Sequence, residues 1–523
     1  MTRDAADGEV VPRNDRLSRY GRWLEGRRAF LSVFCAGALT ALAVPPVNLA
    51  PLWLVSLPVL FLALERSAKA GLKRSAALAW MFGFGHFGFA LYWIVFSLFT
   101  DITKFWFLVP FVVLGLPAGL ALFWAPVGMI WPWLARHAGP VSRIMVGAFA
   151  LAVMELLRGH VLTGFPWGLA GYGWLGFLPL AQLASVLGVY GLTLMTFVIA
   201  SLPAMYLLGQ RKLALRSGAV VLALLIGAGI WGQSRIQGLK TLPDRDVSLR
   251  LAQPNIDQDR KWDRELFQTH MSNLVELSRE GGSVDIVIWP ESAVPFDPSS
   301  TVWFPRVMND LPDGAWLLVG AVRKQGDAFF NSVQASDPDG VVTAIYDKAH
   351  LVPFGEYMPL RSVLPLDAIA AGDFDFTAGP GPRSLGFGGF PTVGPLVCYE
   401  AIFPGKVVSD GDRPDWLLTV TNDGWFGNSA GPHQHFAMAR MRAIEEGLPM
   451  VRVANTGISG VVDTAGIIRT RTELGARAVV DSALPAMTEQ PVFATRPVIM
   501  TFISYLIVLS IAVLCRNFAK RET

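Results

Sequence analysis

Residues 180–208 read LAQLASVLGVYGLTLMTFVIASLPAMYLL, and this stretch contains no charged side chain. A helix of about 20 apolar residues crosses the hydrocarbon core of a bilayer, which is about 30 Å thick. The stretch therefore predicts a transmembrane helix. Comparable apolar stretches lie on both sides of it, so the same argument extends through the first half of the chain.

Seven apolar stretches of this kind precede residue 235, and an eighth follows about 260 residues later. We expect the helices over 29–46, 48–64, 75–99, 106–134, 141–157, 180–208, 217–233 and 496–515. The sequence thus predicts a polytopic α-helical membrane protein with about eight transmembrane helices. Seven of them form a membrane domain over 29–235, and the last follows an inserted domain of ordinary polarity over 244–490.

The composition of the whole chain agrees with a membrane protein. Of its 523 residues, 52% are hydrophobic and 16% are charged, against roughly 25% charged residues in soluble domains. The 44 basic and 41 acidic residues nearly cancel, so no nucleic-acid partner is expected. Three cysteines exclude a disulfide scaffold and a four-cysteine zinc site. Cys35 and Cys515 lie in apolar stretches, as small buried residues do, and only Cys398 lies in a polar region.

The loops between the predicted helices differ in charge from one side to the other. Lys and Arg resist translocation, whereas acidic residues have little effect. On one side, the loops and the C-terminal tail hold twelve basic residues: Arg66, Lys69, Lys73, Arg74, Arg136, Arg143, Arg211, Lys212, Arg216, Arg516, Lys520 and Arg521. The loops on the other side hold only Lys104 and Arg158. We therefore expect a cytoplasmic basic N-terminus over 1–28, a cytoplasmic tail over 516–523, and an extracytoplasmic domain over 244–490. In a bacterium this domain faces the periplasm.

Two motifs in the membrane half have competing interpretations. The basic leader and Ala41-Leu42-Ala43 resemble a signal peptide, although cleavage there would leave every later orientation unchanged. Gly83, Gly85 and Gly88 form a literal G-x-G-x-x-G. Because they lie inside an apolar helix with no preceding strand, close helix packing is favoured over dinucleotide binding.

Polar and aromatic residues also occur near the predicted outer interface. Glu155 is an intramembrane carboxylate and hence a functional candidate. Arg158, three residues on, lies on the same helical face and favours a structural ion pair. The loop from Gly164 to Trp174 is rich in aromatic residues. It fits either an ordinary aromatic belt or the floor of a lipid entry site, and the sequence leaves both open.

From Val247 onward, short β-branched runs alternate with amphipathic stretches. We expect strands over 247–253, 284–289, 315–322, 329–336, 341–347, 391–398 and 416–421, and helices near 263–280, 302–311 and 432–446. Asp337-Pro338-Asp339-Gly340 reads as a hairpin turn between two of these strands. This alternation predicts an α/β domain rather than a β-sandwich.

Three of the predicted strands end at chemically reactive residues. Glu291 follows the strand that begins near 284, Lys348 follows the strand over 341–347, and Cys398 ends the strand over 391–398. Ligands in α/β sheets gather beyond the carboxyl ends of strands. A lysine ammonium stabilises a thiolate and an oxyanion, and a carboxylate can take and return the thiol proton. Together the three form a complete set for acyl transfer.

Histidines offer a different arrangement. His350, His433 or His435 could act as the base of a cysteine–histidine pair, although none lies in a cysteine-protease signature. His433 and His435 alone lack the third and fourth ligands of a zinc site. We therefore expect no metal and no cofactor.

Three segments resemble the signature segments of the nitrilase, or carbon–nitrogen hydrolase, superfamily. They are Trp289-Pro290-Glu291-Ser292, the run YDKAHLVPFGEYMP over 346–359, and Val397-Cys398-Tyr399-Glu400. Their reactive residues are 57 and then 50 residues apart, in the order of the family. The resemblance implies an αββα sandwich for the extracytoplasmic domain.

Seven apolar stretches before this domain and one after it are similar to a single membrane branch, the bacterial apolipoprotein N-acyltransferases. The segments 253–262, 421–427 and 440–457 also resemble that branch, although Pro254 stands where a glycine is expected. By this resemblance the catalytic residues are Glu291, Lys348 and Cys398. The supporting or substrate-binding residues are Trp262, Glu356, Tyr399 and Glu400, and for Tyr399 and Glu400 a purely structural network is equally compatible with the sequence.

The resemblance also implies a reaction. An acyl chain passes from a phospholipid, usually phosphatidylethanolamine, through a cysteine thioester to the α-amino group of the N-terminal diacylglyceryl-cysteine of an apolipoprotein. Both substrates are anchored in the outer leaflet of the bacterial inner membrane, where an extracytoplasmic thiol reaches them. One alternative is a membrane-tethered amidase or nitrilase that hydrolyses a C–N bond. Another is a transporter with a sensory outer domain, for which Glu155 and His86 are the main ionisable candidates.

Overall fold

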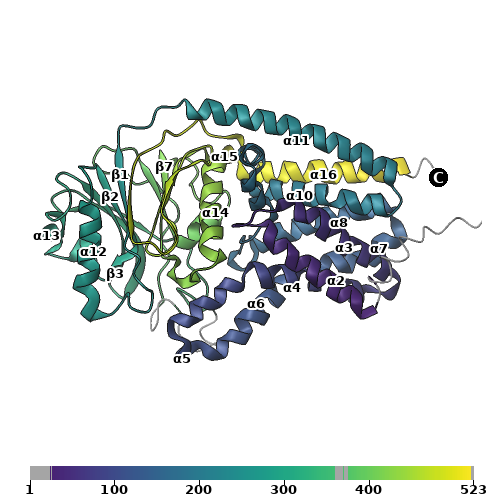
Figure 1. Cartoon of the computed structure of the whole chain (residues 1–523), viewed down its shortest axis with the longest axis horizontal. Helices are drawn as coiled ribbons and strands as arrows, with labels where there is room; N and C mark the ends of the chain where they lie inside the picture. The colour runs from purple at the N-terminus through teal and green to yellow at the C-terminus, as the bar shows by residue number, and fades with distance from the viewer. Residues whose placement is uncertain (1–23, 25, 360–368, 370–374, 520–523) are drawn as a thin grey trace, which may run out of the picture.

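The computed structural model describes residues 24, 26–359, 369 and 375–519. The expected N-terminal segment 1–28 and tail 516–523 lie largely outside the described residues. The described chain forms a helical bundle with an α/β domain at one end (Figure 1). The long helix α11 (Arg211–Lys240) leads into this domain and α16 (Pro497–Ala519) leads out of it. The start of α11 and the end of α16 both lie at the end of the bundle away from the domain.

The bundle is built from apolar helices that match most of the predicted stretches. Its longer helices besides α11 and α16 are α2 (Gly26–Leu39), α3 (Trp53–Ser67), α4 (Leu72–Ala90), α7 (Ala125–His137), α8 (Pro140–Arg158) and α10 (Ala184–Leu207). Within the described residues, five helical segments are long and apolar enough to cross a membrane, and a bent pair adds a sixth. The count of eight transmembrane helices therefore stays a prediction.

The single helix expected over 75–99 is wrong. Helix α4 ends at Ala90, and after Leu91 the chain continues as the 3₁₀ helix η4 (Tyr92–Asp101). The two halves of this bent pair meet at 51°. Gln434 of the α/β domain donates a hydrogen bond to the Ala90 carbonyl and accepts one from Trp93. The bend is thus accompanied by a contact with a residue that is distant in the sequence. The apolar character of the stretch 75–99 alone could not predict this bend.

The glycines of α4 allow close helix packing, as the apolar context predicts. A Cβ atom added at Gly85 would lie 2.3 Å from the carbonyl oxygen of Phe34 in α2, and one at Gly83 would lie 3.2 Å from Ala121. A side chain at Gly88 would meet nothing within 4 Å. Two of the three glycines therefore serve packing.

The α/β domain contains two stacked sheets. The first sheet has the order β11-β1-β2-β3-β4-β5 and the second has the order β10-β9-β8-β7-β6. Their bounds are β1 (Ser248–Gln253), β2 (Ile286–Val294), β3 (Trp316–Gln325), β4 (Ala328–Ser336), β5 (Val342–Asp347), β6 (Val393–Val397), β7 (Trp416–Thr421), β8 (Met450–Ala454), β9 (Gly460–Val462), β10 (Ile468–Arg471) and β11 (Ala478–Ala483). Strands β1, β2 and β3 are parallel, as are β6, β7 and β8.

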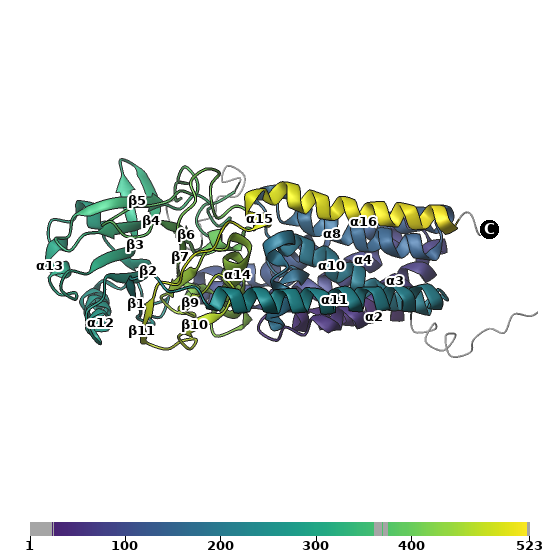
Figure 2. The ribbon, with the colours of Figure 1, turned by 90° about the horizontal axis from the view of Figure 1, so that it is seen from above.

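Helices cover the outer faces of both sheets. Helix α12 (Phe267–Arg279) and the short α13 (Phe304–Met308) pack on the first sheet, and α14 (Ala430–Glu446) packs on the second. Apolar side chains of both sheets share one core between them. The layers are therefore α, β, β and α, as expected (Figure 2).

All seven predicted strands are present, and the turn over 337–340 joins β4 to β5 as an antiparallel hairpin. The sequence reading missed β8 to β11. The helix expected over 302–311 is shorter than predicted and covers only Phe304–Met308.

Helix α14 lies between the second sheet and the bundle (Figure 1). The side-chain amide oxygen of Gln434 accepts hydrogen bonds from Trp93 and Trp167 at 3.0 and 2.7 Å, and the Val189 N–H donates to Glu445 at 2.7 Å. These buried contacts fix the α/β domain on the bundle.

Candidate active site

Glu291, Lys348 and Cys398 meet in the wall of one cavity of about 2160 Å³. Glu291 lies in β2, in the irregular part of its pairing with β3 between Trp289 and Val294. Lys348 directly follows β5, and Cys398 directly follows β6. Their exposed fractions are 7%, 1% and 8%. The fold therefore brings the three residues of the predicted set together from strands of both sheets.

Cys398 has a left-handed backbone conformation, with φ +52°. A residue other than glycine in this region is strained by about 1–3 kcal/mol and persists only where its surroundings hold it. Glu400 provides part of that support. Its carboxylate accepts hydrogen bonds from the N–H groups of Val397 (2.7 Å), Ala349 (2.8 Å) and His350 (3.1 Å) and from the Tyr346 hydroxyl (2.9 Å). The geometry thus places Glu400 in a network that ties the end of β6 to the end of β5.

A chain of polar contacts joins Lys348 to Glu291. Lys348 Nζ donates to the Glu356 carboxylate at 2.8 Å. Asn331 Nδ2 donates to Glu356 Oε1 at 3.1 Å and to Glu291 Oε1 at 2.8 Å. The second carboxylate oxygen of Glu356 accepts from the Val352 N–H at 2.9 Å. Glu356 therefore orients Lys348, and Asn331 orients both carboxylates.

The charges of these groups act on one another because all are buried. Burial raises the pKa of the Cys398 thiol, the Glu291 carboxylate raises it further, and the Lys348 ammonium opposes both. Burial also raises the pKa of Glu291. For Lys348 burial acts to lower the pKa, but Glu356 and Glu291 together raise it. The resting thiol is therefore protonated, the lysine is charged, and the thiol needs a base.

Glu291 has the geometry of that base. Its Oε1 is held by Asn331, whereas Oε2 is buried and has no hydrogen-bond partner among the described residues. One carboxylate oxygen is thus fixed and the other is available to take a proton.

Lys261 is a further buried cation, which sequence reasoning missed. Its Nζ donates to the Glu291 carbonyl at 2.9 Å, and its exposed fraction is 8%. Burial lowers the pKa of Lys261 to about 8, although the charges of Glu291 and Cys398 oppose this shift. In the sequence it lies in a charged run before Trp262, where a solvated lysine is the usual expectation. Trp262 itself lines the cavity and is 48% exposed.

Asn331 was also missed, because a single asparagine in a strand carries no chemical signature. The pairing of β4 with β5 places Asn331 next to Lys348. The Lys348 N–H donates to the Asn331 carbonyl at 2.8 Å.

The aromatic loop of the membrane half forms part of the cavity wall. Gly164, Phe165 and Trp167 line the cavity, and the Tyr399 hydroxyl donates to the Gly164 carbonyl at 3.1 Å. Trp167 also lies against Trp93, with ring centroids 4.7 Å apart. The residue after the candidate nucleophile is thus bound directly to the bundle.

Glu155 has the structural partner that its spacing predicts. Arg158 forms a buried ion pair with it at 2.6 Å, and Trp124 donates to the same carboxylate at 2.9 Å. Arg158 also donates to the carbonyl groups of Phe165 and Trp167. The pair therefore holds the aromatic loop in place.

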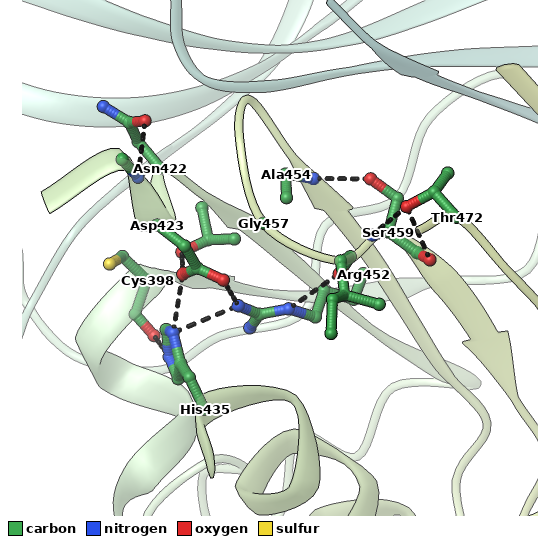
Figure 3. Close-up of polar contacts among 12 residues, drawn as sticks. Cys398, Asn422, Asp423, His435, Arg452, Ala454, Gly457, Ser459 and Thr472 are labelled. Atoms are coloured by element: carbon green, nitrogen blue, oxygen red, sulfur yellow. Dashed lines mark hydrogen bonds and ion pairs between the residues drawn. The ribbon is translucent and has the colours of Figure 1, made fainter. Parts of the chain in front are cut away.

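The histidines do not form a cysteine–histidine pair. The ring nitrogens of His435 contact the Cys398 carbonyl at 3.0 Å and Asp423 at 2.9 Å, rather than the thiol (Figure 3). The His350 ring stacks on Phe403 with centroids 3.9 Å apart. Among the described residues, no group of three or more His, Cys, Asp or Glu side chains is arranged to hold a metal ion.

Comparison with known families covers both parts of the chain. Residues 36–202 match the model described as the apolipoprotein N-acyltransferase N-terminal domain, and residues 248–490 match the carbon–nitrogen hydrolase model. The apolipoprotein N-acyltransferase of Rhodopseudomonas palustris is 39% identical, over 90% of this chain and 91% of that protein. This chain belongs to the apolipoprotein N-acyltransferase family.

Other members of the apolipoprotein N-acyltransferase family are similar over a comparable length. The protein of Bradyrhizobium diazoefficiens is 38% identical, over 90% of this chain and 91% of its own. Among solved structures, a carbon–nitrogen hydrolase superfamily protein from Xanthomonas campestris matches 46% of this chain and 91% of its own length, with 22% identity and a TM-score of 0.36.

Proposed function

We propose that this chain transfers an acyl chain from a phospholipid, through a thioester on Cys398, to the α-amino group of the N-terminal diacylglyceryl-cysteine of apolipoproteins. The observation that carries the proposal is the cavity that holds Cys398. Its walls come from both parts of the chain and include a run of apolar residues of the bundle: Phe105, Phe107, Leu108, Phe111, Val112, Leu116, Leu120 and Phe123. An acyl chain buries its methylene groups against such walls at a gain of about 0.8 kcal/mol each.

In the first half-reaction, Cys398 attacks the donor ester. Glu291 Oε2 takes the thiol proton, and the thiolate adds to the ester carbonyl carbon. The Lys348 ammonium, oriented by Glu356, faces the oxyanion of the tetrahedral intermediate. As the carbon–oxygen bond breaks, Glu291 returns the proton to the leaving alkoxide. Lysophospholipid departs, and the acyl chain stays on Cys398 as a thioester.

In the second half-reaction, the acceptor amine attacks the thioester. Glu291 removes a proton from the amine, and Lys348 again faces the oxyanion. The carbon–sulfur bond breaks, the Cys398 thiolate is released and is protonated by Glu291, and the product carries the acyl chain as an amide. Because the first product leaves before the second substrate reacts, the kinetics are ping-pong.

The donor is phosphatidylethanolamine, and the protein resides in the bacterial inner membrane with its catalytic domain in the periplasm. The twelve basic residues on one side of the apolar stretches, against two on the other, support this orientation. A reporter fused after Trp231 is expected to be external, and one fused after Arg521 internal. A cytoplasmic reporter at Trp231 would overturn the orientation.

The alternative from the sequence is a membrane-tethered amidase or nitrilase with water as acceptor. The apolar cavity wall from the bundle favours the lipid substrate over a small polar amide. The test is to incubate the purified protein with phosphatidylethanolamine and a diacylglyceryl lipopeptide. Lysophospholipid and N-acylated lipopeptide in equal amounts support acyl transfer, whereas free fatty acid without acylated peptide would show hydrolysis instead.

A further inference from the structure

Behind Cys398 lies a second polar cluster that the reaction above does not use. Asp423, His435 and Arg452 are all buried, with side-chain exposures of 0%. Arg452 Nη2 donates to Asp423 Oδ2 at 2.6 Å, the Thr421 hydroxyl donates to Asp423 Oδ1 at 3.0 Å, and His435 Nδ1 lies 2.9 Å from the same oxygen. Figure 3 shows Asp423 and Arg452 beside Cys398, with His435 below them in the view.

The cluster reaches the active site through one hydrogen bond. His435 Nε2 lies 3.0 Å from the Cys398 carbonyl oxygen. A carbonyl oxygen only accepts, so Nε2 carries the hydrogen. Nδ1 lies within hydrogen-bond distance of both Asp423 Oδ1 and Arg452 Nη2, at 2.9 and 3.1 Å. Whether Nδ1 donates to the carboxylate or accepts from the guanidinium, Nε2 remains the donor to the Cys398 carbonyl. Burial and the Arg452 guanidinium lower the pKa of His435, and the Asp423 carboxylate opposes them. Nε2 donates to the Cys398 carbonyl whether the ring is neutral or charged.

This hydrogen bond fixes the peptide group between Cys398 and Tyr399. In a trans peptide the C=O and the following N–H point in opposite directions, and the cis bond found among the described residues is Pro45–Pro46. With the Cys398 carbonyl held by His435, the Tyr399 N–H must point to the opposite side. Tyr399 is the second residue of the 3₁₀ helix η11 (Cys398–Ile402), where a backbone N–H has no partner within the helix.

The peptide needs such a restraint because Cys398 is strained. Its φ of +52° is unfavourable for a residue with a side chain, so contacts on both sides of Cys398 are needed to maintain it. On the N-terminal side, Glu400 accepts a hydrogen bond from the Val397 N–H. On the C-terminal side, His435 binds the Cys398 carbonyl. Asp423 and Arg452 both contact His435 Nδ1 and so restrain the rotation of its ring.

We propose that His435 is a positioning residue for acyl transfer: by binding the Cys398 carbonyl, it directs the Tyr399 N–H at the oxyanion, where that N–H assists Lys348. The inference rests on the proposed function and assigns to His435 the orientation of the peptide group that follows the nucleophile. In this role His435 acts through the Cys398 carbonyl and not on the thiol.

The experiment separates reactions that form an oxyanion from one that does not. Loading of Cys398 by phosphatidylethanolamine passes through a tetrahedral oxyanion, whereas alkylation of the same thiol by iodoacetamide displaces iodide and forms none. His435→Phe removes the donor, and His435→Gln retains an N–H donor. His433→Phe, two residues away on α14 and half-buried, is the matched control.

We expect His435→Phe to slow single-turnover loading by ~10²–10³-fold, the usual cost of a lost oxyanion donor, with an unchanged rate of alkylation. His435→Gln is expected to recover most of the loading rate, and His433→Phe to match wild type. If His435→Phe does not fold, Asp423→Asn, which releases the ring, is expected to show the same split between loading and alkylation.

Equal losses in loading and alkylation would overturn the inference, because they would indicate a general disturbance of Cys398. Normal loading in His435→Phe would also overturn it. Neither outcome affects the proposed function, which fails separately if wild type is not loaded by phosphatidylethanolamine.

Discussion

Lys348 and Glu356 form a buried ion pair at 2.8 Å, and Asn331 connects that pair to Glu291. The ammonium is therefore held at one carboxylate in the wall of the cavity. The same polar chain keeps the base and the cation at a fixed separation.

Lys348→Arg is expected not to restore activity, although it keeps the positive charge. A guanidinium is a wide planar fork that cannot take the place of a compact ammonium between Glu356 and the oxyanion. Loss of such electrostatic stabilisation costs ~10²–10³-fold in rate. The measurement is single-turnover loading of folded protein. Near wild-type loading in the Arg variant would remove Lys348 from the oxyanion site.

Asn331→Ala is expected to lower the loading rate by about 10- to 100-fold, or about 1.4–2.7 kcal/mol in the barrier, because the hydrogen bonds that orient both buried carboxylates are lost. Gln334→Ala is the matched control. Gln334 lies on the same strand and is equally buried, but it donates to Asp297 away from the site. Similar losses in both variants would show that disturbance of strand β4, rather than loss of the Asn331 amide, slows the loading.

The pH dependence of loading is expected to show the titration of Lys261. Its lowered pKa of about 8 means that the ammonium is present below pH 8 and is lost above it. This charge favours the carboxylate form of Glu291 and the thiolate of Cys398, so the loading rate should fall as pH rises through about 8.

In Lys261→Arg the cation persists at high pH, and the alkaline fall should move upward. Lys324→Arg, an exposed change on β3, is the control and should leave the profile unchanged. An alkaline limb that stays at the same pH in Lys261→Arg would assign the titration to another group.

Glu400→Gln is expected to lower stability more than it lowers the chemistry per folded molecule. The carboxylate accepts from three backbone N–H groups and one hydroxyl, and an amide replaces one acceptor oxygen by a donor. A buried donor left facing another donor costs about 1–3 kcal/mol. Thermal unfolding should show a clear drop, with a smaller one in Tyr346→Phe, which removes a single donor. Unchanged stability with abolished loading would make Glu400 a participant in the reaction.

Much of the fold was predictable because the signals are local. Apolar length marks the spans, and alternating β-branched runs mark β1 to β7. Lys348 and Cys398 directly follow their strands as predicted, whereas Glu291 lies inside β2, which continues to Val294. Among the strands that were missed, β9 and β10 have only 3 and 4 residues. Strands β10 and β11 also have exposed faces with polar residues such as Arg469 and Asp481.

The supporting residues of the site were harder to predict, since each takes its role from a distant contact. Lys261 meets Glu291 30 residues away, and His435 meets Cys398 37 residues away. The bend after Ala90 has the same origin, because Gln434 binds its carbonyl from the other domain. No local pattern encodes these pairings.

The most direct test of the account is mass spectrometry of the intact protein after incubation with dipalmitoyl phosphatidylethanolamine and no acceptor. We expect one palmitoyl group on Cys398, removable by neutral hydroxylamine as a thioester is, and discharged when diacylglyceryl lipopeptide is added. Cys35→Ala should load normally, and Cys398→Ala should neither load nor turn over. A Cys398→Ala protein that still acylates the lipopeptide at a normal rate would contradict the covalent mechanism.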